Sequence, residues 1–148
     1  MATAAITGRK AILRASTAAA STATTSQTAL AELQNYTLTV SSDVIDVTSH
    51  DSAGWKEVLS GIRSYSWSAD LVYVSTGAGQ GALRAALLST AAAGAPLVNI
   101  SFMQTTATAS KKYQGKTRLT GLEVAHGTND AVLGKLSGVG HGALLRTA

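Results

Sequence analysis

The stretch that decides the predicted fold is Asp43–Ser68, which reads DVIDVTSHDSAGWKEVLSGIRSYSWS. Its end belongs to Ser64–Tyr73, where aromatic and apolar residues alternate with residues that are mostly serine or aspartate. Alternation with a period of two is typical of a strand that is buried on one face, as in antiparallel sheets. Before this strand, the pattern predicts another strand at 44–48, a polar turn, and a helical turn at 54–59 that ends at Gly61.

Four apolar residues of this stretch are predicted to form one core: Trp55, Leu59, Tyr65 and Trp67. The spacing places Trp55 and Leu59 on the helical turn, where they can close over the sheet face that carries Tyr65 and Trp67. Burial of two tryptophans and a tyrosine contributes several kcal/mol, at about 25 cal/mol per Å² removed from water. We therefore expect these residues to anchor the fold.

The remaining pattern predicts a mainly β protein. One amphipathic helix is expected at Gly79–Ala92, because Gly94 and Pro96 follow it and proline cannot continue a helix. Further strands are predicted at 10–14, 35–40, 96–103, 113–124, 132–139 and 143–146. The length is that of a single domain over residues 1–148. The expected fold is a β-sandwich or barrel of antiparallel strands with one flanking α-helix.

The segment 15–29 is rich in alanine, serine and threonine and has no apolar periodicity. A long unstructured segment in a compact domain is usually functional or disordered. Two interpretations stay open: an arm that becomes ordered on a neighbouring subunit, or a flexible loop. Only 14% of all residues are charged, and a weakly charged surface is poorly protected against association.

Composition also limits the function classes. The chain contains no cysteine, which excludes disulfides and thiolate chemistry, and no stretch is predicted to be a signal peptide or a membrane span. We therefore expect a soluble protein used in the cytoplasm. The net charge is +4, with one mild basic cluster at Lys111, Lys112, Lys116 and Arg118. A solvated strand face explains this cluster better than a polyanion contact, because nucleic-acid binders concentrate basic residues more densely.

No catalytic, cofactor-binding or metal site is predicted. Gly77, Gly79 and Ala82 fit part of a dinucleotide-binding fingerprint, but the acidic residue expected about 20 positions later is absent, since no Asp or Glu lies between Asp70 and Glu123. The histidines are far apart and lack metal-type partners: His50, His126 and His141. The segment 138–142 is better explained as a bent strand end. We expect the protein not to be an enzyme.

The order of elements in Asp43–Ser68 closely resembles the major tail (tail tube) proteins of long, non-contractile, siphophage-type tails. The similar motifs are IDVT at 45–48, GWKE at 54–57 and a Gly-(basic)-Ser strand at 61–64. Flanking strands at 30–38, 118–124 and 131–145 extend the resemblance over about residues 30–146.

The resemblance implies a virion structural protein, assembled in the bacterial host cytoplasm. Hexameric rings of this protein would stack into a tube that conducts genome DNA into the host cell, with no membrane contact. The implied partners are other copies, a tape-measure protein, tail terminator and tip proteins, and DNA passing without sequence-specific binding. Implied inter-subunit contacts are Asp46, Thr48, Ser49, Asp51, Ser52 and Arg63.

Family lumens are often acidic, whereas this chain has a pI near 9.6. We therefore predict that the basic cluster at 111–118 does not form a continuous lumen lining. Two alternatives remain open. One is a tube subunit of a related contractile injection, secretion or gene-transfer particle, and the other is a monomeric β-sandwich binding module.

Overall fold

The computed structural model describes residues 12–16, 27–30, 32–51, 54–73, 77–89, 97–103, 112–126 and 132–147. The elements are β1 (Ile12–Ser16), β2 (Thr28–Ala29), β3 (Leu33–Asp46), β4 (Val58–Val72), α1 (Ala78–Leu87), β5 (Val98–Met103), β6 (Lys112–Ala125) and β7 (Leu133–Thr147). The strands form one antiparallel sheet in the order β2-β1-β5-β6-β7-β4-β3. The predicted mainly β fold with one helix is confirmed.

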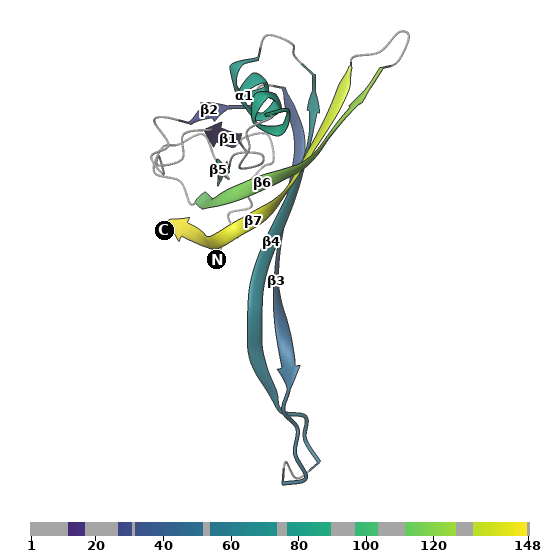
Figure 1. The fold of residues 1–148 in the computed structure, drawn as a ribbon, viewed down its shortest axis with the longest axis vertical. Coiled ribbons are helices and arrows are strands. Elements are labelled where there is room, and N and C mark those ends of the chain that lie inside the picture. The colour runs from purple at the N-terminus through teal and green to yellow at the C-terminus, as the bar shows by residue number, and fades with distance from the viewer. Residues whose placement is uncertain are drawn as a thin grey trace, which may run out of the picture.

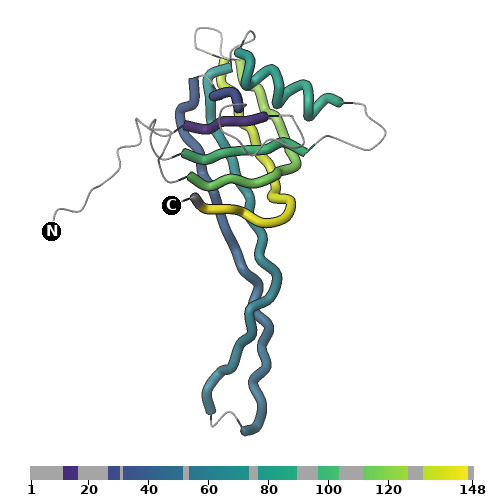
Figure 2. Tube along the Cα trace, turned by 90° about the vertical axis from the view of Figure 1, so that its left-hand side faces the viewer, coloured from purple at the N-terminus to yellow at the C-terminus, as the bar shows by residue number. Residues whose placement is uncertain are grey.

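The sheet folds back on itself because β6 and β7 bend. Figure 2 shows β1 and β5 crossing β3 and β4 at a steep angle. A register shift between Gln114 and Lys116 and a positive φ of 78° at Gly142 mark the bend. Strands that pass from one layer to the other through bulges are typical of orthogonally packed sheets. One layer, here called the wall, comprises β3, β4, residues 133–139 of β7 and 118–125 of β6.

The covering layer comprises β1, β5 and the bent ends of β6 and β7, and the hydrophobic core lies between it and the wall. The ring of Phe102 on β5 contacts Trp67 on β4 edge-on, with centroids 6.1 Å apart, and Tyr36 on β3 at 5.7 Å. Helix α1 adds Leu83 and Ala86 to this core. The core therefore joins residues far apart in the sequence.

The aromatic residues Tyr65 and Trp67 are both buried, and they lie against glycines of β7. A side chain on Gly138 would place its Cβ 2.6 Å from the indole nitrogen of Trp67, and Tyr65 occupies the corresponding space at Gly140. The Tyr65 hydroxyl donates a hydrogen bond to the carbonyl of Lys116. Glycine is needed at these positions because the aromatic rings fill the side-chain space.

Helix α1 ends at Leu87, before the predicted end, and residues 90–96 lie outside the described part. Its glycine-rich start serves packing. A Cβ on Gly79 would lie 2.6 Å from the carbonyl oxygen of Ala29. The side-chain Nε2 of Gln80 donates a hydrogen bond of 3.0 Å to the carbonyl of Val72. Close backbone approach thus accounts for the glycine that resembled a nucleotide motif.

The predicted helical turn at 54–59 is wrong. Gly54 adopts a turn conformation with φ of 83°, and Leu59 pairs with Ile45 in the β3–β4 hairpin. The predicted strand at 35–40 and residues 44–46 of the strand predicted at 44–48 merge into β3, with a register shift between Ser42 and Val44. Cross-strand pairing overrides the local helix signals because each added pair continues an existing ladder. In the same way, the predicted strands at 132–139 and 143–146 merge into β7.

The segment 15–29, predicted as an arm or loop, has both ends in the sheet. Ala15 and Ser16 belong to β1, and Thr28 and Ala29 form β2. The buried hydroxyl of Ser101 on β5 also bonds the Gln27 side chain. Residues 17–26 lie outside the described part, so the arm itself stays a prediction.

Candidate self-association surfaces

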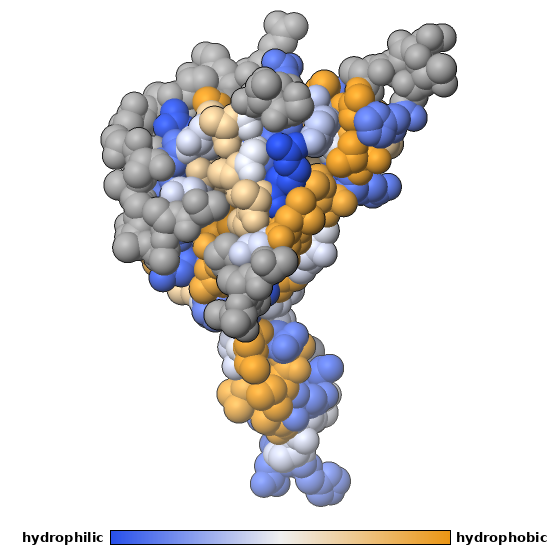
Figure 3. Space-filling model, turned by 45° about the horizontal axis from the view of Figure 1, so that its top comes forward, coloured by the Kyte–Doolittle hydropathy of each residue, from blue (hydrophilic) through white to orange (hydrophobic). Residues whose placement is uncertain are grey.

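The β3–β4 hairpin projects far beyond the two layers (Figure 1). Its apolar side chains are exposed: Trp55 is 80%, Ile62 78% and Val44 67% accessible. The same hairpin exposes Val40, Ile45, Val47, Val58 and Leu59. Figure 3 shows apolar residues gathered on this projection, with hydrophilic residues at its end. Large exposed apolar patches mark interaction sites in soluble proteins.

The predicted common core therefore fails at Trp55 and Leu59, because the hairpin carries them away from the body where Tyr65 and Trp67 are buried. Sequence reasoning also overlooked Ile62 as a surface residue. The signal was present: by strand alternation Ile62 shares the face of Ser64, Ser66 and Ser68. An apolar residue on an otherwise polar face indicates contact with something outside the chain.

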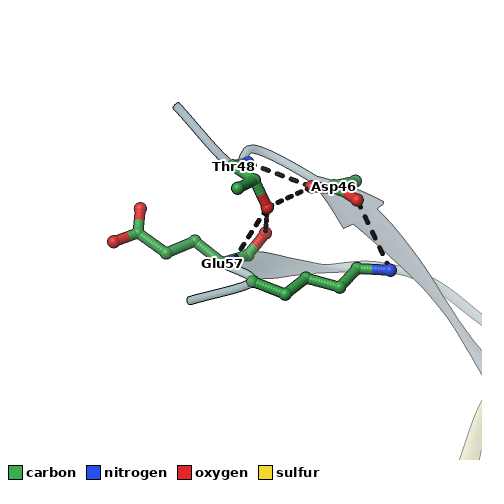
Figure 4. Close-up of polar contacts among 4 residues, drawn as sticks. Asp46, Thr48 and Glu57 are labelled. Atoms are coloured by element: carbon green, nitrogen blue, oxygen red, sulfur yellow. Dashed lines mark hydrogen bonds and ion pairs between the residues drawn. The ribbon is translucent and has the colours of Figure 1, made fainter. Parts of the chain in front are cut away.

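Asp46 and Thr48, both predicted as subunit contacts, hold the end of the hairpin together (Figure 4). The Asp46 carboxylate accepts hydrogen bonds from the backbone amide of Thr48 at 3.0 Å and from its hydroxyl at 2.6 Å. The Thr48 hydroxyl in turn accepts a hydrogen bond from the backbone amide of Glu57 at 3.0 Å. The Lys56 Nζ forms an ion pair with the Asp46 carboxylate at 3.4 Å. The hydrogen bonds from Thr48 lower the pKa of Asp46 below its usual value. The contacts order a fully exposed loop.

The other predicted contact residues are distributed as follows. Ser49 and Asp51 are exposed in the same loop, and Ser52 lies outside the described part. Arg63 is exposed on β4 and borders an open hollow together with Arg146. All the described contact candidates thus lie on one hairpin, and their contacts with another subunit stay a prediction.

A second surface consists of two free strand edges. In the described part of the chain, β3 pairs with β4 only, so its outer edge is open. Strand β5 pairs with residues 112–117 of β6, which leaves residues 118–125 paired with β7 alone. Open edges present unpaired amides and carbonyls and are templates for pairing with another chain. Within the ranges that the structure describes, the wall therefore has an open edge on each side.

The described residues contain no group of three or more histidine, aspartate or glutamate side chains placed to bind a metal ion. No helix among them is long and apolar enough to cross a membrane.

A family model described as phage tail tube protein matches residues 5–146. The chain belongs to this family. The family predicted from the sequence is therefore confirmed. No curated protein sequence matches the chain significantly.

Chains in solved tail and baseplate structures share the fold. The tail of an empty gene transfer agent particle, with C6 symmetry, aligns with a TM-score of 0.75 at 21% identity, covering 97% of this chain and all of that one. The SPP1 tail tube aligns at 0.74 and 14% identity, covering 97% and 80%. The baseplate of the anti-feeding prophage aligns at 0.71 and 9% identity, covering 100% and 98%.

Proposed function

We propose that this protein is a non-catalytic tail tube subunit. Copies form hexameric rings, the rings stack into a hollow tube, and genome DNA passes through it into the host cell. The protein works in the virion after assembly in the host cytoplasm. The observation that carries this proposal is the pair of open strand edges on opposite sides of the wall.

The two edges have matching directions. Three antiparallel pairings separate β6 from β3, so these strands run antiparallel to each other. Rotating one copy about an axis along the wall places its β3 beside residues 118–125 of the next copy in antiparallel orientation. Repetition of this contact closes a ring and leaves no free edge. Hexamers are supported by the C6 symmetry of the gene transfer agent tail, whose subunit has the same fold.

The projecting hairpin supplies contacts along the tube. It extends in the strand direction, beyond the body of its own subunit (Figure 1). A head-to-tail contact that does not close generates a filament. Seating Trp55, Ile62 and Val44 on the next ring would cover the apolar surface that a free monomer exposes. The predicted contacts at Asp46, Thr48, Ser49, Asp51, Ser52 and Arg63 belong to this hairpin.

The kind of particle is a separate question. The likeness to a gene transfer agent tail and to an anti-feeding prophage supports a related particle as the second candidate. Tape-measure, terminator and tip proteins are the expected partners in a long tail. A neighbouring tape-measure gene without a sheath gene supports the siphophage-type tail, whereas a sheath gene supports a contractile particle.

Electron microscopy of the purified protein tests the proposal. Negative staining at rising concentration should show rings and then tubes, and helical reconstruction should show β3 of one subunit paired with β6 of the next. A protein that stays monomeric at every concentration would refute the proposal and support the isolated binding module.

A further inference from the structure

The wall has one covered face and one bare face. Leu71, Trp67 and Leu136 point from the wall into the core, against the covering layer and α1. In Figure 1, β1, β2, β5 and α1 all lie on this same side of the wall. In a ring, a bulky layer fits on the outside, where the circumference is larger. Given the tube proposed above, the bare face therefore lines the bore.

Strand registers place the residues of the bare face in rows across the wall. Of three consecutive rows, the one farthest from the hairpin contains Glu123, Lys135, Asp70 and Asn35 on β6, β7, β4 and β3. The middle row contains Gly121, Ser137, Ser68 and Thr37, and Thr120 joins it beside Gly121 at the register shift of β6. The row nearest the hairpin contains Arg118, Val139, Ser66 and Thr39. The hydroxyls of Thr120 and Ser137 lie 3.1 Å apart, which joins the middle row across β6 and β7.

The charges in these rows balance. The first row sets the single Lys135 between Glu123 and Asp70, and these three residues line one shallow hollow. The last row has Arg118 as its one charged residue. The three rows together hold two basic and two acidic residues, so the whole excess of four positive charges lies elsewhere in the chain.

We propose that the bore of this tube is electrically balanced, with an acidic band and a basic band separated by a band of hydroxyls. Arg118 pairs with Val139, which pairs in turn with Ser66 on β4. Because Asp70 lies four residues from Ser66 on β4, Asp70 and Arg118 are about 13 Å apart along the strands, at about 3.3 Å per residue. This separation is comparable with the screening length of about 8–10 Å at physiological salt. A DNA phosphate is therefore drawn by one band while the next repels it, and no long stretch of the bore holds it.

The proposal also locates the basic cluster. Lys112 and Lys116 belong to the part of β6 that pairs with β5 in the covering layer, beyond the wall. Arg118 alone among the described members of the cluster joins the bare face. A basic protein can in this way form a bore that does not retain DNA.

Cysteine labelling tests which face lines the bore, because the natural chain has no cysteine. Ser68→Cys places a thiol in the hydroxyl band, and Ala85→Cys places one at an exposed position on α1 as the matched control. In assembled tubes, Ser68→Cys should react with a small maleimide but not with a maleimide on a large polymer, whereas Ala85→Cys should react with both. Equal reaction of both variants with the large reagent would overturn the proposed orientation.

Paired charge removal tests the balance. Asp70→Asn with Glu123→Gln leaves the bare face with a net charge of +2 per subunit, and Arg118→Gln with Lys135→Gln leaves −2. Tubes are incubated with a fluorescent single-stranded oligonucleotide and digested with nuclease, so that only DNA inside the bore survives. Tubes of Asp70→Asn/Glu123→Gln should protect about tenfold more oligonucleotide than natural tubes, and added salt should remove this excess. Tubes of Arg118→Gln/Lys135→Gln should protect no more oligonucleotide than natural tubes.

Equal protection by natural tubes and the Asp70→Asn/Glu123→Gln tubes would refute the balanced bore. This result differs from failure of the proposed function, in which the natural protein forms no tubes at all. The paired substitutions lie on exposed or half-buried positions outside the core, so both variants should fold.

Discussion

Replacing Trp55 with alanine separates assembly from folding. In the single chain, 80% of the Trp55 surface is exposed, so the substitution should change the free energy of unfolding by less than about 0.5 kcal/mol. A tryptophan offers about 200 Å² for contact, and complete coverage by the next ring contributes up to about 5 kcal/mol at about 25 cal/mol per Å². After the cost of ordering the hairpin, we expect a loss of about 3 kcal/mol per subunit contact.

A loss of this size raises the critical concentration for tube formation roughly 100-fold, since 1.4 kcal/mol corresponds to a factor of ten. Sedimentation of tubes at a series of protein concentrations measures this value. Trp67→Ala is the contrasting variant, because Trp67 is 3% exposed and its loss should cost about 3–5 kcal/mol of folding stability.

Fluorescence gives an independent check, because the chain has two tryptophans. In a Trp67→Phe variant, Trp55 is the only tryptophan, and its emission should shift to shorter wavelengths on assembly. If Trp55→Ala assembles at the natural concentration, or the emission stays unchanged in tubes, Trp55 makes no contact between rings.

Two further predictions concern the fold. Gly138→Ala should lower the free energy of unfolding in urea by about 1–3 kcal/mol, because the new Cβ would lie 2.6 Å from the Trp67 ring. Gly81→Ala is the control: open space surrounds Gly81, so this substitution should stabilise α1 slightly. Equal effects of the two substitutions would contradict this reasoning. The lowered pKa of Asp46 means that its stabilisation of the hairpin end is complete above the unfolded pKa of about 3.9 and is lost as pH falls through the lower folded value. The protection factor of the Thr48 amide, which is its exchange rate relative to an unfolded chain at the same pH, should therefore fall only in acid, and Asp46→Asn should remove this pH dependence of the protection.

The sequence predicted those features that depend on local periodicity. Alternation around Tyr65 and Trp67 identified a strand with one buried face, and helical spacing with Pro96 beyond identified one helix. These signals are local because side chains alternate along any strand and repeat along any helix. The order of motifs around Asp43–Ser68 likewise indicated the tail tube family, which the family model confirms.

Pairing between distant segments decided the rest. The helix prediction at 54–59 failed because β3 and β4 continue to pair beyond the body, so Leu59 lies opposite Ile45 in a strand. The residue pattern of one segment does not show how far a distant strand will continue to pair with it. The same limit hid the free edge of β6, which exists because β5 ends its pairing at Thr117.

The two tryptophans show the difference between what the sequence determined and what the tertiary structure decided. Sequence alone predicted that both belong to one core, with Trp55 on a helical turn and Trp67 on a strand. The tertiary structure decided that Trp67 lies in the core, under Phe102, and that Trp55 lies exposed on a projecting hairpin. Burial depends on what lies opposite a side chain, and that is fixed only when the sheet folds.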